Sequence, residues 1–136
     1  MAEARSEQFR QELAVQRPAS GGVRRIVRAH LRLWGFERLV DDAVLCVQEL
    51  LANVVRHTDS SECALTLERR PDRVRLTVSD ASGELPTLRE PDWGAESGRG
   101  LWLVAELADA WGAVRTAGGK DVWCELRATP PRREAV

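Results

Sequence analysis

A regular alternation of apolar and other residues between positions 63 and 78 constrains the fold of this chain more than any other feature. In each half of that segment an apolar side chain recurs at every second position: Cys63, Leu65 and Leu67, then Val74, Leu76 and Val78. The sequence Arg70-Pro71-Asp72 between the two halves is typical of a turn. The pattern predicts a β-hairpin with one apolar face, which other parts of the chain must cover.

Helical segments are predicted to supply that cover. The strongest runs from about Leu39 to His57, because apolar residues recur there at the i, i+3, i+4 spacing of one helix face. Two acidic residues, Asp41 and Asp42, lie near its start, where the helix dipole favours negative charge. Shorter helices are predicted over residues 19–34 and 99–110.

The remaining strands complete an α+β fold. A strand is predicted over residues 9–15, and a second hairpin over residues 111–127 that turns at Gly118-Gly119. Strands that follow one another without regular alternation with helices indicate an antiparallel-rich sheet with helices on one face. The length of 136 residues fits one domain, expected over residues 9–128 with flexible tails at 1–8 and 129–136.

Composition argues against several classes of function. The net charge of -1 gives no general attraction to nucleic acid or to an anionic membrane surface. No apolar run is long enough to span a bilayer, and no apolar stretch follows Met1 as in a signal peptide. A cytoplasmic protein with no membrane and no direct nucleic-acid partner is therefore expected. The three cysteines lack the spacing of a zinc site and are expected to be free, mostly buried thiols.

A polar stripe runs beside the apolar face of the helix predicted over residues 39–57. Glu49, Asn53 and His57 are spaced four residues apart, so they project from one side of the helix, and Arg56 lies close to them. A carboxylate, an amide and an imidazole in this order are unusual on a helix that rests on a sheet. The same residues also suit an ordinary solvated flank, and their spacing alone leaves both interpretations open.

Two further segments carry candidate functional residues. Asp80 ends the most regular predicted strand, where it can bind a ligand or simply initiate the turn at Ala81-Ser82-Gly83. Gly98-Arg99-Gly100-Leu101 opens the helix predicted over residues 99–110, and glycines at a helix start allow backbone N–H groups to approach an anion. Lys120 is the single lysine of the chain; it lies at the turn of the second hairpin, and the pattern assigns it no role.

These segments, taken together and in this order, resemble one known family. They are the sequence ELLANVVRH over residues 49–57, Asp80 at a strand end, and GRGL over residues 98–101. They resemble the GHKL ATP-binding fold shared by gyrase B, MutL and histidine kinases. Within it the chain looks most like the small bacterial anti-sigma-factor and serine/threonine-kinase subgroup. The resemblance covers about residues 9–128 and implies a two-layer sandwich with a mixed, mostly antiparallel sheet.

The resemblance also implies ATP and Mg²⁺ as ligands, and a role for each matching residue. Asn53 matches the amide that coordinates the Mg²⁺ bridging the phosphates, and Glu49 matches the general base that activates the attacking hydroxyl. Asp80 matches the aspartate that accepts a hydrogen bond from the adenine amino group. Nucleotide contacts are implied at the other matched positions: Arg56, His57, Gly83, Gly98, Arg99, Gly100 and Leu101.

Two functions follow from the resemblance as expectations. The first is an anti-sigma factor that binds a sigma factor and phosphorylates a serine or threonine of an anti-anti-sigma (STAS-type) partner. The presence of both Glu49 and Asn53 favours it, and because relatives often dimerise, a homodimer is among the expected assemblies.

The second function is a nucleotide-dependent protein-binding module that lacks kinase activity. It is favoured by the sequence Asp80-Ala81-Ser82-Gly83-Glu84, which departs from the D-x-G-x-G pattern common in the family. The segment between Gly83 and Gly98 is also short for a full ATP lid. A scaffold that binds no nucleotide is the third interpretation.

Overall fold

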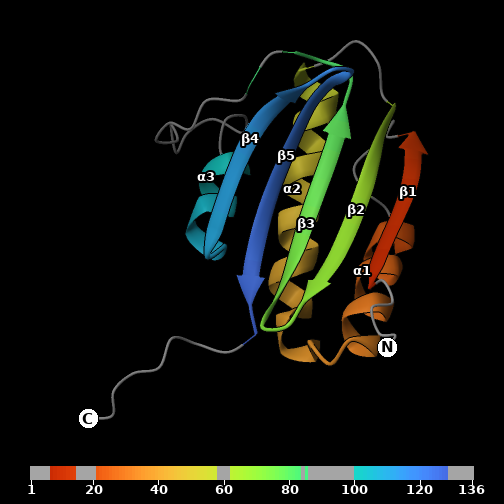
Figure 1. The fold of residues 1–136 in the computed structure, drawn as a ribbon, viewed down its shortest axis with the longest axis vertical. Helices are drawn as coiled ribbons and strands as arrows, with labels where there is room; N and C mark the ends of the chain where they lie inside the picture. Colours follow the sequence, from red (N-terminus) through yellow and green to blue (C-terminus); the bar gives the residue numbers. More distant parts are fainter. Residues whose placement is uncertain (1–6, 15–20, 58–61, 84, 86–99, 129–136) are drawn as a thin grey trace.

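The computed structural model of the chain describes residues 7–14, 21–57, 62–83, 85 and 100–128. Along the chain these residues form β1 (Gln8–Ala14), α1 (Gly21–Leu33), the short 3-10 helix η1 (Glu37–Leu39), α2 (Val40–His57), β2 (Glu62–Arg70), β3 (Arg73–Asp80), α3 (Gly100–Leu107), β4 (Ala110–Thr116) and β5 (Gly119–Arg127). Figure 1 shows the strands side by side in front of the helices.

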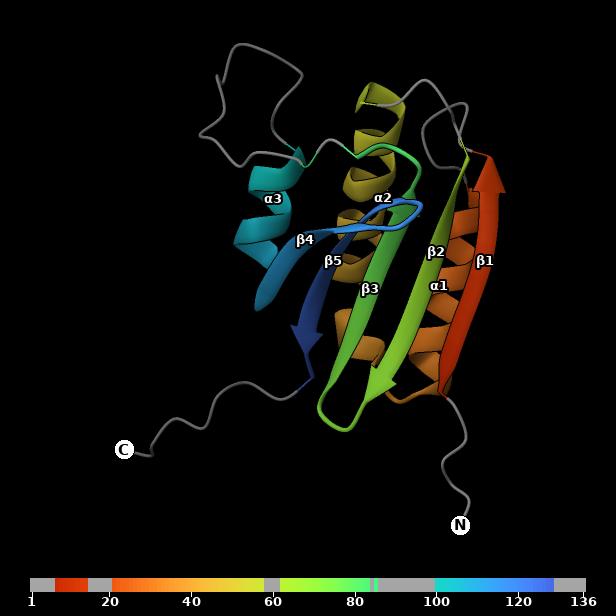
Figure 2. The ribbon, with the colours of Figure 1, turned by 45° about the horizontal axis from the view of Figure 1, so that its top comes forward.

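The strands form one five-stranded sheet in the order β1-β2-β3-β5-β4. Every neighbouring pair in this order is antiparallel. The helices α1, α2 and α3 lie on one side of the sheet, as Figures 1 and 2 show from two directions. This arrangement confirms the α+β fold with helices on one face. Where the prediction allowed a mixed sheet, the described strands are antiparallel throughout.

The hydrophobic core lies between the sheet and its helices. On β2 and β3 the alternate residues that the sequence marked as apolar are all buried, including Leu65, Leu67 and Leu76 at 0% exposure. The apolar face of α2 covers them, and α1 and α3 pack against α2 in turn. A one-residue shift of any strand would turn this apolar row toward water, so the core also fixes the strand register.

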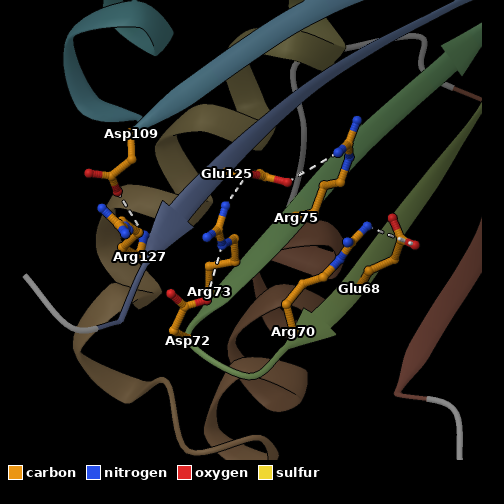
Figure 3. Close-up of polar contacts among 8 residues, drawn as sticks. All are labelled: Glu68, Arg70, Asp72, Arg73, Arg75, Asp109, Glu125 and Arg127. Atoms are coloured by element: carbon orange, nitrogen blue, oxygen red, sulfur yellow. Dashed lines mark hydrogen bonds and ion pairs between the residues drawn. The ribbon is translucent and has the colours of Figure 1, made fainter.

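The opposite face of the sheet is covered by its own polar side chains. Glu125 of β5 accepts hydrogen bonds from Arg73 Nη1 at 2.9 Å and from Arg75 Nη1 at 3.1 Å, one on each carboxylate oxygen (Figure 3). The guanidinium carbon of Arg75 lies 3.9 Å from the ring centroid of Trp123. These contacts leave only 10% of the Glu125 side chain exposed on the face away from the helices.

One helix is shorter than predicted. The helix expected to reach Ala110 ends at Leu107. The Asp109 backbone N–H donates to the Glu125 carbonyl oxygen at 2.9 Å, and Ala110 pairs with Glu125 as the first residue of β4. The sheet therefore takes up these backbone groups before the helix can continue. The long loop predicted after Asp80 falls largely outside the described residues.

The structure also describes the cysteines, the groups that could bind a metal, and the length and polarity of the helices. Cys46, Cys63 and Cys124 are free and buried, as expected. Among the described residues, no group of histidine, cysteine and acidic side chains is arranged to hold a metal ion. None of the helices described has both the length and the apolar character needed to cross a membrane.

The turn between β4 and β5 brings two backbones unusually close. The turn was predicted at Gly118-Gly119, but β5 already begins at Gly119. Gly119 has a φ of +154°, and a Cβ atom at this position would overlap the carbonyl oxygen of Asp80 and the backbone of Ala81. Glycine is therefore required here both for the backbone conformation and for the approach of β5 to the end of β3.

Replacing Gly119 with alanine is expected to lower the free energy of unfolding by about 2 kcal/mol or more, because the added methyl strains the backbone and overlaps Asp80. Gly118→Ala is the matched control, since a Cβ there meets nothing within 4 Å. The control should stay within about 0.5 kcal/mol of the wild type. Urea unfolding followed by tryptophan fluorescence measures both variants, and equal stabilities would contradict the close approach.

Candidate functional site

Segments that are far apart in the sequence lie at the same end of the molecule. They are the C-terminal half of α2, the C-terminal end of β3, and the first residues of α3 and of β5 (Figures 1 and 2). In addition, α2 packs directly against α3, β3 and β5. This end therefore brings together the elements that carry Glu49 and Asn53, Asp80, and Gly100.

A buried ion pair between Asp80 of β3 and Lys120 of β5 lies at this end. The Lys120 Nζ is 3.0 Å from Oδ1 of Asp80 and 2.9 Å from Oδ2. Only 1% of the Lys120 side chain and 2% of the Asp80 side chain are exposed. Either charge alone would carry a large desolvation cost at that depth, so each is the counter-ion that the other requires.

Lys120 is the candidate functional residue that the sequence analysis missed. It is the partner of Asp80 in the β3–β5 register, and it shares the alternation of Val122, Cys124 and Leu126, which are buried in the core. That alternation was a usable signal, because a lysine in an apolar row is rarely buried unless it is paired. Because the turn was predicted one residue too late, Lys120 was assigned to the end of the turn and not to the buried row of β5.

Asp80 also forms the turn that follows β3. Its Oδ1 accepts a hydrogen bond from the Ser82 backbone N–H at 2.8 Å, which is the turn-initiating arrangement that the sequence left as an alternative. The next glycine, Gly83, is exposed, and its carbonyl oxygen accepts a hydrogen bond from Arg115 Nε at 2.9 Å. A Cβ at Gly83 would meet nothing within 4 Å, so packing does not require glycine there.

Cys63 of β2 lies beside the ion pair, as the register partner of Asp80 on the other side. Burial first, and then the negative charge of Asp80, raises the pKa of the Cys63 thiol to about 11. The thiol therefore stays protonated near neutral pH and is a poor nucleophile. The chemistry of this end must come from other groups.

The helix α2 places Glu49 and Asn53 one turn apart, on neighbouring parts of its surface. Glu49 is half-buried, whereas only 9% of Asn53 is exposed. Among the residues that the structure describes, none is hydrogen-bonded to the Asn53 side-chain amide, which makes this amide a candidate partner for a ligand. A nearly buried amide gains stability from such a partner.

The other predicted site residues are described only in part. Arg56 and His57 belong to the last turn of α2, and their side chains lie outside the described residues. Gly98 and Arg99 also lie outside them. Gly100 is the first residue of α3, and the half-buried Leu101 that follows packs against the core.

The match to a family model agrees with this arrangement. The model described as a histidine kinase-like ATPase domain matches residues 15–126, which is most of the chain. The chain belongs to the histidine kinase-like ATPase domain family. A search of curated proteins found no match. Membership of this ATPase family supports nucleotide binding by the domain.

In this ATPase domain, breaking the buried ion pair should cost much more than removing it. Lys120→Met leaves the Asp80 carboxylate buried with only the Ser82 N–H to balance it. We expect the free energy of unfolding to fall by about 3–5 kcal/mol. The double variant Asp80→Asn/Lys120→Met should recover most of that loss, because no buried charge remains in it.

The control for this prediction is the exposed ion pair between Arg32 and Glu37, which are 3.4 Å apart with side chains 56% and 68% exposed. Glu37→Gln should cost less than about 1 kcal/mol. Urea unfolding at low and high salt measures all four proteins, and the effect of Lys120→Met should depend little on salt. A Lys120→Met protein as stable as the wild type would contradict the pairing.

Proposed function

We propose that this chain is an ATP-binding anti-sigma factor with Mg²⁺-dependent serine/threonine kinase activity. Its phosphate donor is ATP, and its acceptor is a serine or threonine of an anti-anti-sigma protein of the STAS type. Binding of a sigma factor and formation of a homodimer belong to the same proposal. Family membership supports the nucleotide part, and the resemblance of the motifs to anti-sigma kinases supports the choice of partner.

The observation that carries the proposal is that Glu49 and Asn53 lie one turn apart on α2, at the end of the molecule where Asp80 ends β3. A protein that only bound nucleotide would have no use for a carboxylate one helical turn before the amide. This arrangement therefore favours a reaction at this place over binding alone.

Each of these residues has a proposed ligand. The side-chain oxygen of Asn53 would hold Mg²⁺, which prefers oxygen ligands and otherwise keeps several waters. An ion held there would supply positive charge against the phosphates. Asp80 accepts a hydrogen bond from the adenine amino group, which guanine replaces with a carbonyl that cannot donate. Backbone N–H groups at the start of α3, from Gly100 on, favour phosphate through the helix dipole.

Glu49 is the proposed general base. Its carboxylate accepts the proton of the acceptor hydroxyl while the hydroxyl oxygen forms a bond to the γ-phosphorus. The bond from that phosphorus to the bridging oxygen of the β-phosphate breaks, and ADP leaves with the bonding electrons. Most of the rate acceleration in such a reaction comes from positioning and charge neutralisation, so the base acts on an already aligned hydroxyl.

The wild type should bind ATP more tightly with Mg²⁺ than without it. At about 100 times its dissociation constant the ligand should raise the free energy of unfolding by about 2.7 kcal/mol. Asn53→Ala removes the proposed metal ligand and should weaken Mg²⁺-ATP binding roughly tenfold, with little change in Mg²⁺-free binding. Calorimetric titration of the wild type and of Asn53→Ala measures ATP binding with and without Mg²⁺, and urea unfolding with and without Mg²⁺-ATP measures the gain in stability. If Mg²⁺ strengthens ATP binding equally in the two proteins, Asn53 does not hold the metal.

Phosphate transfer tests the base. With [γ-³²P]ATP and a purified STAS-type protein, Glu49→Ala should retain ATP binding and lose at least about a hundredfold in the rate of labelling. Gln48→Ala is the matched control, because Gln48 is a half-buried neighbour on the same helix without a proposed role. Normal labelling by Glu49→Ala would show that another group acts as the base.

The hydrogen-bonded loop after Asp80 favours a second function, a nucleotide-dependent binding protein without kinase activity. The Gly83 carbonyl is held by Arg115, and its Cα approaches nothing closely enough to require glycine. The sequence of this loop also departs from the D-x-G-x-G pattern of the family. Partner binding that ATP strengthens, without transfer of label, would select this function over the kinase.

A further inference from the structure

The hydrogen bonds of the Asp80–Lys120 pair do not use its full capacity. An ionised carboxylate offers about four acceptor positions, and an ammonium offers three donors. Oδ1 of Asp80 accepts from Lys120 Nζ at 3.0 Å and from the Ser82 N–H at 2.8 Å. Oδ2 lies 2.9 Å from Lys120 Nζ in the ion pair. Among the described residues, at least one acceptor position therefore remains on Oδ2.

At least one donor of Lys120 also has no acceptor among the residues that the structure describes. Contacts with Oδ1 and Oδ2 of Asp80 take up no more than two of its N–H bonds. No other described residue accepts a hydrogen bond from Nζ. The pair thus presents one remaining acceptor and at least one remaining donor within a few ångströms of each other.

Burial makes this unused capacity important. The Lys120 and Asp80 side chains are 1% and 2% exposed, so bulk water satisfies neither group. A buried donor or acceptor without a partner is costly, and a ligand that supplies both partners at once relieves that cost. The matching ligand must carry a donor and an acceptor side by side.

We infer that Lys120 reads the base of the bound nucleotide, with its free N–H donating to N1 of adenine while Oδ2 of Asp80 accepts from the adenine amino group. This inference rests on the proposed ATP site and adds a specificity-determining residue to it. The adenine edge carries the amino donor next to the N1 acceptor, and the pair offers the complementary order. Both hydrogen bonds involve a charged protein group, which makes them stronger than neutral ones.

The same order rejects guanine in that orientation. Guanine carries a carbonyl at C6 and an N–H at position 1, so the carboxylate would face an oxygen and the ammonium would face a donor. Each mismatch leaves a buried polar group without a partner, and sites of this kind discriminate strongly. With Asp80 alone, only the group at C6 would be read. With Lys120, two adjacent positions of the ring are read.

Nucleotide analogues test the inference on the wild-type protein. The ligands are ATP, 1-deaza-ATP, which replaces N1 with C–H but keeps the amino group, and purine riboside triphosphate, which lacks the amino group but keeps N1. Titration calorimetry with Mg²⁺ should show each analogue binding roughly tenfold or more weakly than ATP. The analogues need no variant, so the result does not depend on how a mutant folds.

Variants then assign the loss to Lys120. Lys120→Met should bind ATP about as weakly as the wild type binds 1-deaza-ATP, and should no longer distinguish the two ligands. The double variant Asp80→Asn/Lys120→Met has no buried charge to destabilise it, and the amide oxygen that it introduces at position 80 can still accept from the amino group. It should likewise bind ATP and 1-deaza-ATP alike while still preferring ATP to purine riboside triphosphate.

Each contrary result has a distinct meaning. If the wild type binds ATP and 1-deaza-ATP equally, Lys120 does not read N1, while the ATP site itself stands. Tighter ATP binding by Lys120→Met would overturn the inference by showing that the ammonium competes with adenine for Asp80. If a folded Lys120→Met protein still rejects 1-deaza-ATP, another residue reads N1. A wild type that binds none of the three nucleotides overturns the proposed function together with the inference.

Discussion

The register between β3 and β5 is the constraint on which the proposed site depends. It sets Asp80 opposite Lys120, and it brings Gly119 against the Asp80 carbonyl. The apolar side chains of β5 fix that register, because a shift of one residue would move them all to the polar face. The same shift would carry the lysine away and leave the aspartate buried without a counter-ion. Core packing and the charge pair therefore depend on one alignment.

The two faces of the sheet use charge in different ways. On the open face Arg73 and Arg75 share Glu125, and the arginines keep 35% and 27% of their side chains in contact with water. The arginines of this cluster stay partly exposed although Glu125 is nearly buried, so salt screens these pairs more than the pair at Asp80. On the helix face, the pair at Asp80 is shielded from water. Only the second arrangement holds polar groups in fixed positions with capacity left for a ligand.

Much of the fold follows from local patterns in the sequence, whereas part of the site does not. The alternation between residues 63 and 78 and the apolar stripe of the long helix predicted the sheet, its cover and the buried faces, because these depend on periodicity alone. The predicted end of α3 was wrong, because the backbone N–H of Asp109 donates to a carbonyl oxygen of the distant strand β5. The role of Lys120 was missed because the turn of the second hairpin was predicted one residue too late, which left Lys120 outside the buried row of β5. Its partner lies 40 positions away, and only the pairing of β3 with β5 joins them.

A charge-neutral pair is a suitable element for the base end of a triphosphate site. A lone aspartate would add negative charge to a site that must accept several more, and at low dielectric that repulsion extends over many ångströms. Lys120 cancels the charge without removing the acceptor that Asp80 offers to the amino group. Attraction of the phosphates is then left to groups at the other end of the nucleotide, such as Mg²⁺ and the start of α3. The base end can discriminate by the pattern of donors and acceptors, because it contributes almost no net charge to binding.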